Sequence, residues 1–175
     1  MKKLVLLLVV LTFWVYSASA GEIANIFSSS IFDLIWFSTI DEVKQKYPGG
    51  VLKSEYGITS YRILDGRTVL TVKRKNSNYI DFIFNSENQL NNVAVQFPLD
   101  TPQSAPNLLN KLTTYFGPQS DNPKAAGNTL VIQWPEDNGF IINMINIVNM
   151  FKDDELVFGI GCTKPVSADK KQLGF

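Results

Sequence analysis

The chain has 175 residues, 45% of them hydrophobic and 18% charged, and its sixteen basic residues are balanced by sixteen acidic ones. This composition is typical of a globular protein and excludes a disordered or collagen-like chain. Broad binding to nucleic acid or to an anionic membrane needs an excess of basic residues, so we expect no nucleic-acid partner.

The N-terminus has the three parts of a secretory signal peptide. A basic pair, Lys2-Lys3, precedes an apolar run from Leu4 to Tyr16, and Ala18-Ser19-Ala20 supplies the small residues of a cleavage site. A membrane anchor is the alternative, but the run is shorter than the roughly 20 residues needed to span a bilayer. We therefore expect residues 1–20 to be removed, which leaves a periplasmic or secreted protein with no stable membrane insertion.

Histidine is absent from the sequence, and Cys162 is its only cysteine. Without histidine the chain lacks the commonest general base and metal ligand, and no Ser-His or Cys-His pair can form. A single cysteine allows no intrachain disulfide, which for an exported protein favours a bacterial envelope. We therefore expect no cofactor, no metal site and no catalytic residue, and we interpret Cys162 as a buried small side chain rather than a reactive thiol.

Helical patterns occupy the start of the mature chain. The stretch 21–37 has apolar residues near helical spacing, interrupted by serines, and is interpreted as a short helix or an irregular packed segment. Thr39 and Glu42 have the spacing of a capping box. The helix that they begin is predicted to end at Tyr47, because Pro48-Gly49 follows.

A four-stranded antiparallel meander is predicted next. Strands 58–64 and 67–73 flank Asp65-Gly66, a dipeptide that favours a two-residue hairpin because both positions tolerate positive φ. Two further stretches, 79–84 and 93–97, alternate apolar and polar residues on either side of a polar turn.

The second half of the chain repeats this order. Apolar residues recur at helical spacing at Ala105, Leu108, Leu109, Leu112 and Phe116. Gly117-Pro118 ends this helix, and a polar loop at 120–128 follows. Three stretches are then interpreted as strands, at 130–134, 140–151 and 156–162.

The stretch 140–151 has a helical alternative. Its Val and Ile content and the Asp-Asn-Gly turn before it favour a strand. Three asparagines at spacing three, Asn143, Asn146 and Asn149, would instead form a polar stripe on a helix.

These elements predict an α+β fold: an antiparallel β-meander sheet with two helices packed on one face. We expect a single domain of residues 21–162, followed by a polar tail, 163–175. The domain divides into possible tandem units, 38–97 and 104–162, each a helix followed by a meander. The first helix ends at Tyr47-Pro48-Gly49 and the second at Tyr115-Phe116-Gly117.

This architecture, with Thr39-x-x-Glu42 and the two Tyr-x-Gly stops, resembles the β-lactamase inhibitor proteins. One unit is also similar to the small lipoprotein of the outer-membrane β-barrel assembly machinery. The resemblance implies a binding module rather than an enzyme. The chain differs from the inhibitors in having no cysteine pair, and from the lipoprotein in having no lipid-attachment cysteine near the cleavage site.

We therefore interpret the protein as an exported, non-catalytic binding module for a protein partner of the cell envelope, of inhibitor, immunity or envelope-assembly type. The alternative is a carboxylate-dependent hydrolase acting on envelope glycan, which would need two carboxylates in one cleft. The sequence does not indicate an oligomeric state.

Aromatic residues are the candidate partner-binding residues, because Trp and Tyr dominate interface hot spots. The four that we expect on a binding face are Trp36, Tyr61, Tyr79 and Trp134. The alternative is that they fill the core between helices and sheet. The charged runs Lys73-Arg74-Lys75, Glu136-Asp137 and Asp153-Asp154-Glu155 are interpreted as solvated turns.

The signal-peptide assignment predicts the mass of the mature protein. Because cleavage follows Ala20, protein recovered from the envelope or the medium should begin at Gly21. Intact-mass spectrometry checks this. A product that retains Met1 and fractionates with membranes would show that the segment is an anchor.

Overall fold

The computed structural model describes residues 22–55, 57–120, 123–148 and 154–164. The predicted signal peptide and most of the predicted tail lie outside these residues. The helices are α2 (Glu22–Phe27), α3 (Ile40–Lys46) and α4 (Ser104–Phe116). The strands are β1 (Val51–Glu55), β2 (Ile58–Leu64), β3 (Tyr79–Phe84), β4 (Leu90–Phe97), β5 (Lys124–Ala126), β6 (Thr129–Gln133), β7 (Phe140–Ile147) and β8 (Glu155–Cys162).

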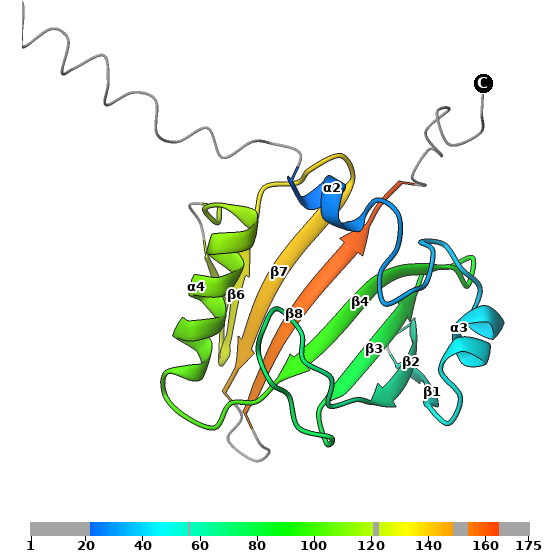
Figure 1. The fold of residues 1–175 in the computed structure, drawn as a ribbon, viewed down its shortest axis with the longest axis horizontal. Coiled ribbons are helices and arrows are strands. Elements are labelled where there is room, and N and C mark those ends of the chain that lie inside the picture. The colour runs from blue at the N-terminus through cyan, green and yellow to red at the C-terminus, as the bar shows by residue number, and fades with distance from the viewer. Residues whose placement is uncertain (1–21, 56, 121–122, 149–153, 165–175) are drawn as a thin grey trace, which may run out of the picture.

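The eight strands form one antiparallel sheet in the order β1-β2-β3-β4-β8-β7-β6-β5 (Figure 1). The first half of the chain contributes α2, α3 and a four-stranded meander, and the second half contributes α4 and another four-stranded meander. The two meanders meet where β4 pairs with β8. The predicted α+β class with an antiparallel meander is therefore confirmed. None of the helices that the structure describes has the length and apolar character required to cross a bilayer.

Helix α3 begins at the predicted capping box. The Thr39 hydroxyl accepts a hydrogen bond from the Glu42 amide at 3.3 Å, and a Glu42 carboxylate oxygen accepts one from the Thr39 amide at 2.7 Å. The hydrogen bond from the Thr39 backbone lowers the pKa of Glu42. The side chain of Val43 is the buried residue of this short helix, and Tyr47, at its C-terminal end, stacks on Phe82 of β3.

Helix α4 also follows its predicted pattern. Its buried side chains, Leu108, Leu112 and Phe116, lie on one stripe. The helix ends at Gly117, whose φ of 77° suits glycine. The indole N–H of Trp134 donates to the Gly117 carbonyl at 2.9 Å, so this helix end is fixed to the second meander.

The predicted hairpin at Asp65-Gly66 is wrong. Residues 67–73 form no strand and contain only an isolated bridge between Val69 and Val72. Strand β2 pairs instead with β1, which the sequence analysis did not predict. The Asp65 carboxylate accepts hydrogen bonds from the backbone and side chain of Arg67, while the Asp65 amide donates to the more distant Asn78 carbonyl at 2.8 Å. The segment 65–78 is therefore a loop.

This loop is anchored by a buried arginine. The Arg74 side chain donates to the carbonyls of Gln96 and Tyr79, each at 2.7 Å, and lies 3.5 Å from an Asp65 carboxylate oxygen. Arg74 is only 3% exposed, so the expectation of a solvated Lys73-Arg74-Lys75 turn is wrong at its central residue. Three apolar residues of the loop, Val69, Leu70 and Val72, pack against the core.

The second meander contains one unpredicted strand. Strand β5 lies within the segment expected to be a polar loop. Strand β7 pairs with both β6 and β8, so the strand interpretation is correct for Phe140–Ile147 and the helical alternative is wrong there. Asn149 and the end of the predicted strand lie outside the described residues.

All three described helices pack on one face of the sheet, which we call the helical face (Figure 1). Phe27 of α2 contacts Phe116 of α4, with ring centroids 5.9 Å apart, and Phe116 stacks on Phe158 of β8. The core therefore lies between this face and the helices. The opposite face, which we call the open face, has no helix packed on it among the described residues.

Substitution of Leu112 tests whether α4 is docked through this stripe. Its side chain is fully buried, so Leu112→Ala should lower the free energy of unfolding by roughly 2–5 kcal/mol, the range for a buried leucine. Asn110→Ala, on the exposed side of the same helix, should change it far less. Urea denaturation measures both, and equal losses would show that Leu112 does not dock the helix.

Candidate functional site

The open face is defined by the pairing register of the strands. Residues directly opposite each other in antiparallel strands point to the same face. Lys53 lies opposite Ser60, and Ser60 opposite Ile83. Arg62 lies opposite Asp81 in the same way. These side chains therefore project together from β1, β2 and β3, away from the helices.

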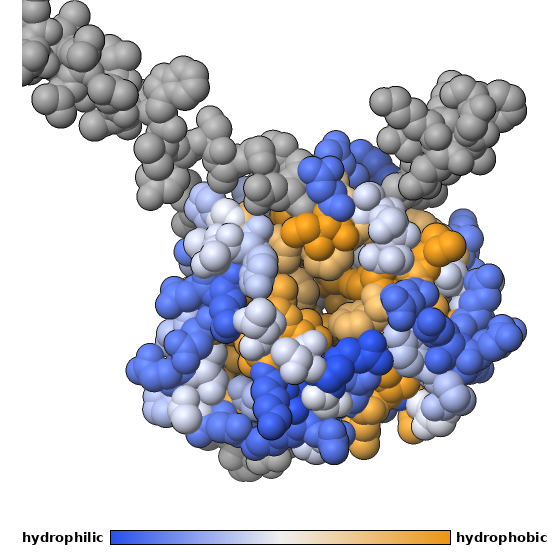
Figure 2. Space-filling view, in the orientation of Figure 1, coloured by the Kyte–Doolittle hydropathy of each residue, from blue (hydrophilic) through white to orange (hydrophobic). Residues whose placement is uncertain are grey.

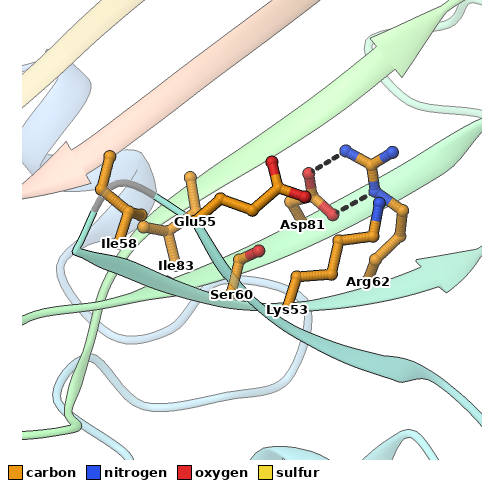
Figure 3. Close-up of a pocket in the computed structure, with 7 residues that line it drawn as sticks. All are labelled: Lys53, Glu55, Ile58, Ser60, Arg62, Asp81 and Ile83. Atoms are coloured by element: carbon orange, nitrogen blue, oxygen red, sulfur yellow. Dashed lines mark hydrogen bonds and ion pairs between the residues drawn. The ribbon is translucent and has the colours of Figure 1, made fainter.

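A shallow groove of about 240 Å³ lies on this face near the β1 edge. Figure 3 shows its lining residues, which are Lys53, Glu55, Ile58, Ser60, Arg62, Asp81 and Ile83. Two cationic and two anionic side chains share the groove with two isoleucines. A surface of this kind combines a charge pattern with apolar contact area, and both contribute to recognition of a protein partner.

The fixed feature of the groove is the ion pair of Arg62 and Asp81. The Arg62 Nε–H donates to Asp81 Oδ1 at 2.7 Å, and Nη2 donates to Oδ2. This two-bond arrangement holds both planar groups in one orientation. The side chains are 30% and 12% exposed, respectively. The hydrogen bond to Asp81 raises the pKa of Arg62, so the guanidinium remains a permanent cation at the surface.

Tyr79 supports this pair from below. The Arg62 guanidinium carbon lies 3.6 Å from the centroid of the Tyr79 ring, within the range of a cation–π contact. The Tyr79 hydroxyl donates to Glu155 at 3.0 Å. Burial, followed by the nearby Glu155 charge, raises the pKa of Tyr79. The tyrosine therefore stays neutral and connects the arginine of β2 to the first residue of β8.

Two glycines of β8 lie in the middle of the open face and leave room there for neighbouring side chains. Gly159 lies opposite Asn143, and Gly161 lies opposite Asn92. A Cβ added at Gly159 would collide with the Asn143 carboxamide, and one at Gly161 would lie 3.2 Å from the Asn92 amide nitrogen. The asparagine side chains thus occupy the space above the glycines, next to the small Ala94 of β4.

A second cavity, of about 220 Å³, lies on the helical face. Figure 2 shows this face with hydrophobic residues in and around a central hollow. The cavity is lined by Ile26 and Phe27 of α2, by residues of the following segment and of the 65–78 loop, and by Phe158 of β8. Phe32 and Leu70, both in its lining, have φ of 50° and 51°, a conformation that is uncommon for bulky residues. Its apolar lining provides no group for acid–base chemistry.

The four aromatic residues proposed from the sequence are all buried, with exposed fractions between 1% and 8%. The indole of Trp36 donates to the Phe27 carbonyl, and the hydroxyl of Tyr61 donates to the Tyr47 carbonyl. The indole N–H of Trp134 donates a hydrogen bond to the carbonyl at the end of α4. Trp36, Tyr61 and Trp134 belong to the core cluster, as the alternative interpretation expected, so they form no exposed patch. Tyr79 alone lies at the groove, underneath Arg62.

Among the carboxyl groups that the structure describes, two have clearly shifted pKa values, and neither shift is that of a general acid. Glu42 and Asp65 have shifted pKa values, and both are lowered, whereas a catalytic acid needs a raised one. Burial raises the pKa of the Cys162 thiol, which donates to the Lys164 carbonyl at 3.0 Å. Within the described ranges, no three acidic or cysteine side chains gather closely enough to hold a metal ion.

Two of the acidic residues interpreted as solvated have structural contacts. Asp137 is 8% exposed and accepts a hydrogen bond from the Ala24 amide at 2.9 Å, which fixes α2 to the turn before β7. Glu155 is the partner of Tyr79. Asp153 lies outside the described residues. The solvated-turn interpretation is therefore wrong for Asp137 and for Glu155.

Comparisons of this chain with protein-family models, with curated proteins and with solved structures found no match.

Sequence reasoning missed most of the groove because it missed β1. The alternation of residues 79–84 places Asp81 on the polar side of β3, but no pattern in the sequence identified Arg62 as its partner. A usable signal was a turn expected at Gly57, between residues 51–55 and 58–64, because glycine favours turns. That turn would have replaced the Asp65-Gly66 hairpin and brought Lys53 and Glu55 beside Ser60.

The ion pair of the groove can be tested with matched substitutions. Asp81→Asn removes a charge that makes two hydrogen bonds to Arg62 and should cost roughly 1.5–3 kcal/mol of unfolding free energy. Asp100→Asn breaks the exposed pair with Lys75 and should cost less than about 1 kcal/mol. Urea denaturation compares the two. Equal costs would show that the Arg62–Asp81 pair is not a fixed feature.

Proposed function

We propose that this protein is an exported, non-catalytic binding module that engages a protein partner of the cell envelope through the open face of its sheet. The observation that carries the proposal is the groove of β1, β2 and β3, where a fixed Arg62–Asp81 pair lies beside the partly exposed Ile83. Ordered charges next to apolar area are the arrangement by which protein surfaces combine specificity with affinity.

The chemistry of the groove favours a protein partner over other ligands. Its two cations and two anions balance, so it does not attract a polyanion such as nucleic acid. The groove is shallow and lies across three neighbouring strands, β1, β2 and β3. Small-molecule sites are instead enclosed and mostly apolar. A broad surface with both charge signs fits another folded protein.

The hydrolase alternative has one observation in its favour, because Glu55 and Asp81 are two carboxylates in the same groove. Asp81, however, has both oxygens hydrogen-bonded to Arg62, so it is occupied as a counter-ion. Release of sugar from envelope glycan by the purified protein, lost in Glu55→Gln, would favour the alternative over the binding module.

Site-specific crosslinking tests the proposed binding function. A photo-activated amino acid at Ser60, inside the groove, should give a discrete product with a different protein in the envelope of the organism that encodes the chain. The same amino acid at Asn110, on the exposed side of α4, should not. Mass spectrometry identifies the product.

An added charge provides the matched control. Ile83→Arg in the groove should reduce the Ser60 product at least tenfold, because it places an unpaired cation in the contact surface. Asn110→Arg should leave the product unchanged. No product from Ser60, or equal products from Ser60 and Asn110, would contradict a partner on the open face.

A further inference from the structure

Strand β1 forms one edge of the sheet, and among the described strands it pairs only with β2. Four of its five residues are exposed. An edge strand presents a row of free backbone N–H and C=O groups, which can pair with another strand. The backbone of β1 is therefore open to addition of a further strand.

Exposed apolar side chains gather at this edge. The described residues include nine large hydrophobic side chains that are exposed, and four of them lie on β1 or β2. They are Val51, Leu52, Ile58 and Leu64, with exposed fractions of 60%, 47%, 56% and 70%. Single exposed apolar residues are normal on a protein surface, but a cluster at an open edge marks an interaction site.

The charges of β1 are complementary to a second copy of the same strand. Lys53 and Glu55 point to the open face, one opposite Ser60 and the other opposite Ile58. Neither makes an ion pair within the described part of the chain. In an antiparallel copy of β1, the order of these two residues along the shared face is reversed. The cation of one copy can therefore lie opposite the anion of the other.

We propose that two copies of this protein associate by antiparallel pairing of their β1 strands, with Ser54 of each copy on the two-fold axis. In this register Lys53 of each copy lies opposite Glu55 of the other, on the same face. An axis at Lys53 would place the two Lys53 side chains opposite each other, and an axis at Glu55 would oppose the two glutamates. The charges therefore select one register.

The pairing joins the two eight-stranded sheets into one continuous sheet with both open faces on the same side. The axis is perpendicular to the sheet, because opposed residues of antiparallel strands share a face. The groove is also completed, because Lys53 and Glu55 form its outer wall and each gains an opposite charge from the second copy. This inference concerns self-association and does not depend on the proposed envelope partner.

Charge exchange tests the proposal. In sedimentation equilibrium, the purified protein should form dimers in a concentration-dependent manner, and Lys53→Glu or Glu55→Lys alone should weaken dimerisation at least tenfold. The double variant Lys53→Glu/Glu55→Lys should restore it. An equimolar mixture of the two single variants should also form dimers, because each copy then supplies the charges that the other needs. Lys124→Glu on β5, at the opposite edge, makes the same charge change as Lys53→Glu and should have no effect.

A covalent readout tests the register without relying on affinity. Ser54→Cys should form a disulfide-linked dimer on mild oxidation, because opposed Cα atoms of antiparallel strands lie within disulfide range. Ser60→Cys on β2 should not, and the native Cys162 is buried. A wild-type protein that stays monomeric at all concentrations, single charge variants that dimerise like the wild type, or a double variant that is not restored would each overturn the proposal.

Discussion

The antiparallel pairing of β4 with β8 joins the two meanders into one sheet and shapes both of its faces. Toward the helices, it places Val93 opposite Ile160 and Val95 opposite Phe158, and all four side chains are buried in the core. On the open face, the same strands bring Ala94 beside Gly159. This central pair thus presents large apolar side chains toward the helices, and the helices pack on that side.

Local patterns predicted the elements that local interactions stabilise. The capping box of α3, the stripe of α4 and the strands β3 and β4 each depend on residues a few positions apart, and these predictions are confirmed. The Asp65-Gly66 hairpin failed because a long-range contact overrode local preference. Arg74 is buried against carbonyls of β3 and β4, and the loop that it holds covers the core with apolar side chains.

The candidate site was less predictable than the fold, because its residues come from three strands and only their register brings them together. Composition identified aromatic residues as binding candidates, but burial decides their role, and three of the four complete the core. Tyr79 was chosen because tyrosine is frequent in interface hot spots, whereas its contribution is to support Arg62 from beneath. The pairing of Arg62 with Asp81 required β2 and β3 to be aligned, which no local pattern specifies.

The position of the β4–β8 pair has a consequence for the order of folding. Each meander consists of strands that are neighbours in the chain, so it can form from contacts of short sequence separation. The central pair instead joins Asn92 to Gly161 and Phe97 to Leu156. Closing the long loop between these residues costs conformational entropy before any contact of the pair has formed. Joining of the two halves is therefore the step expected to limit the folding rate, and the backbone edges of β4 and β8 stay unpaired with each other until it occurs.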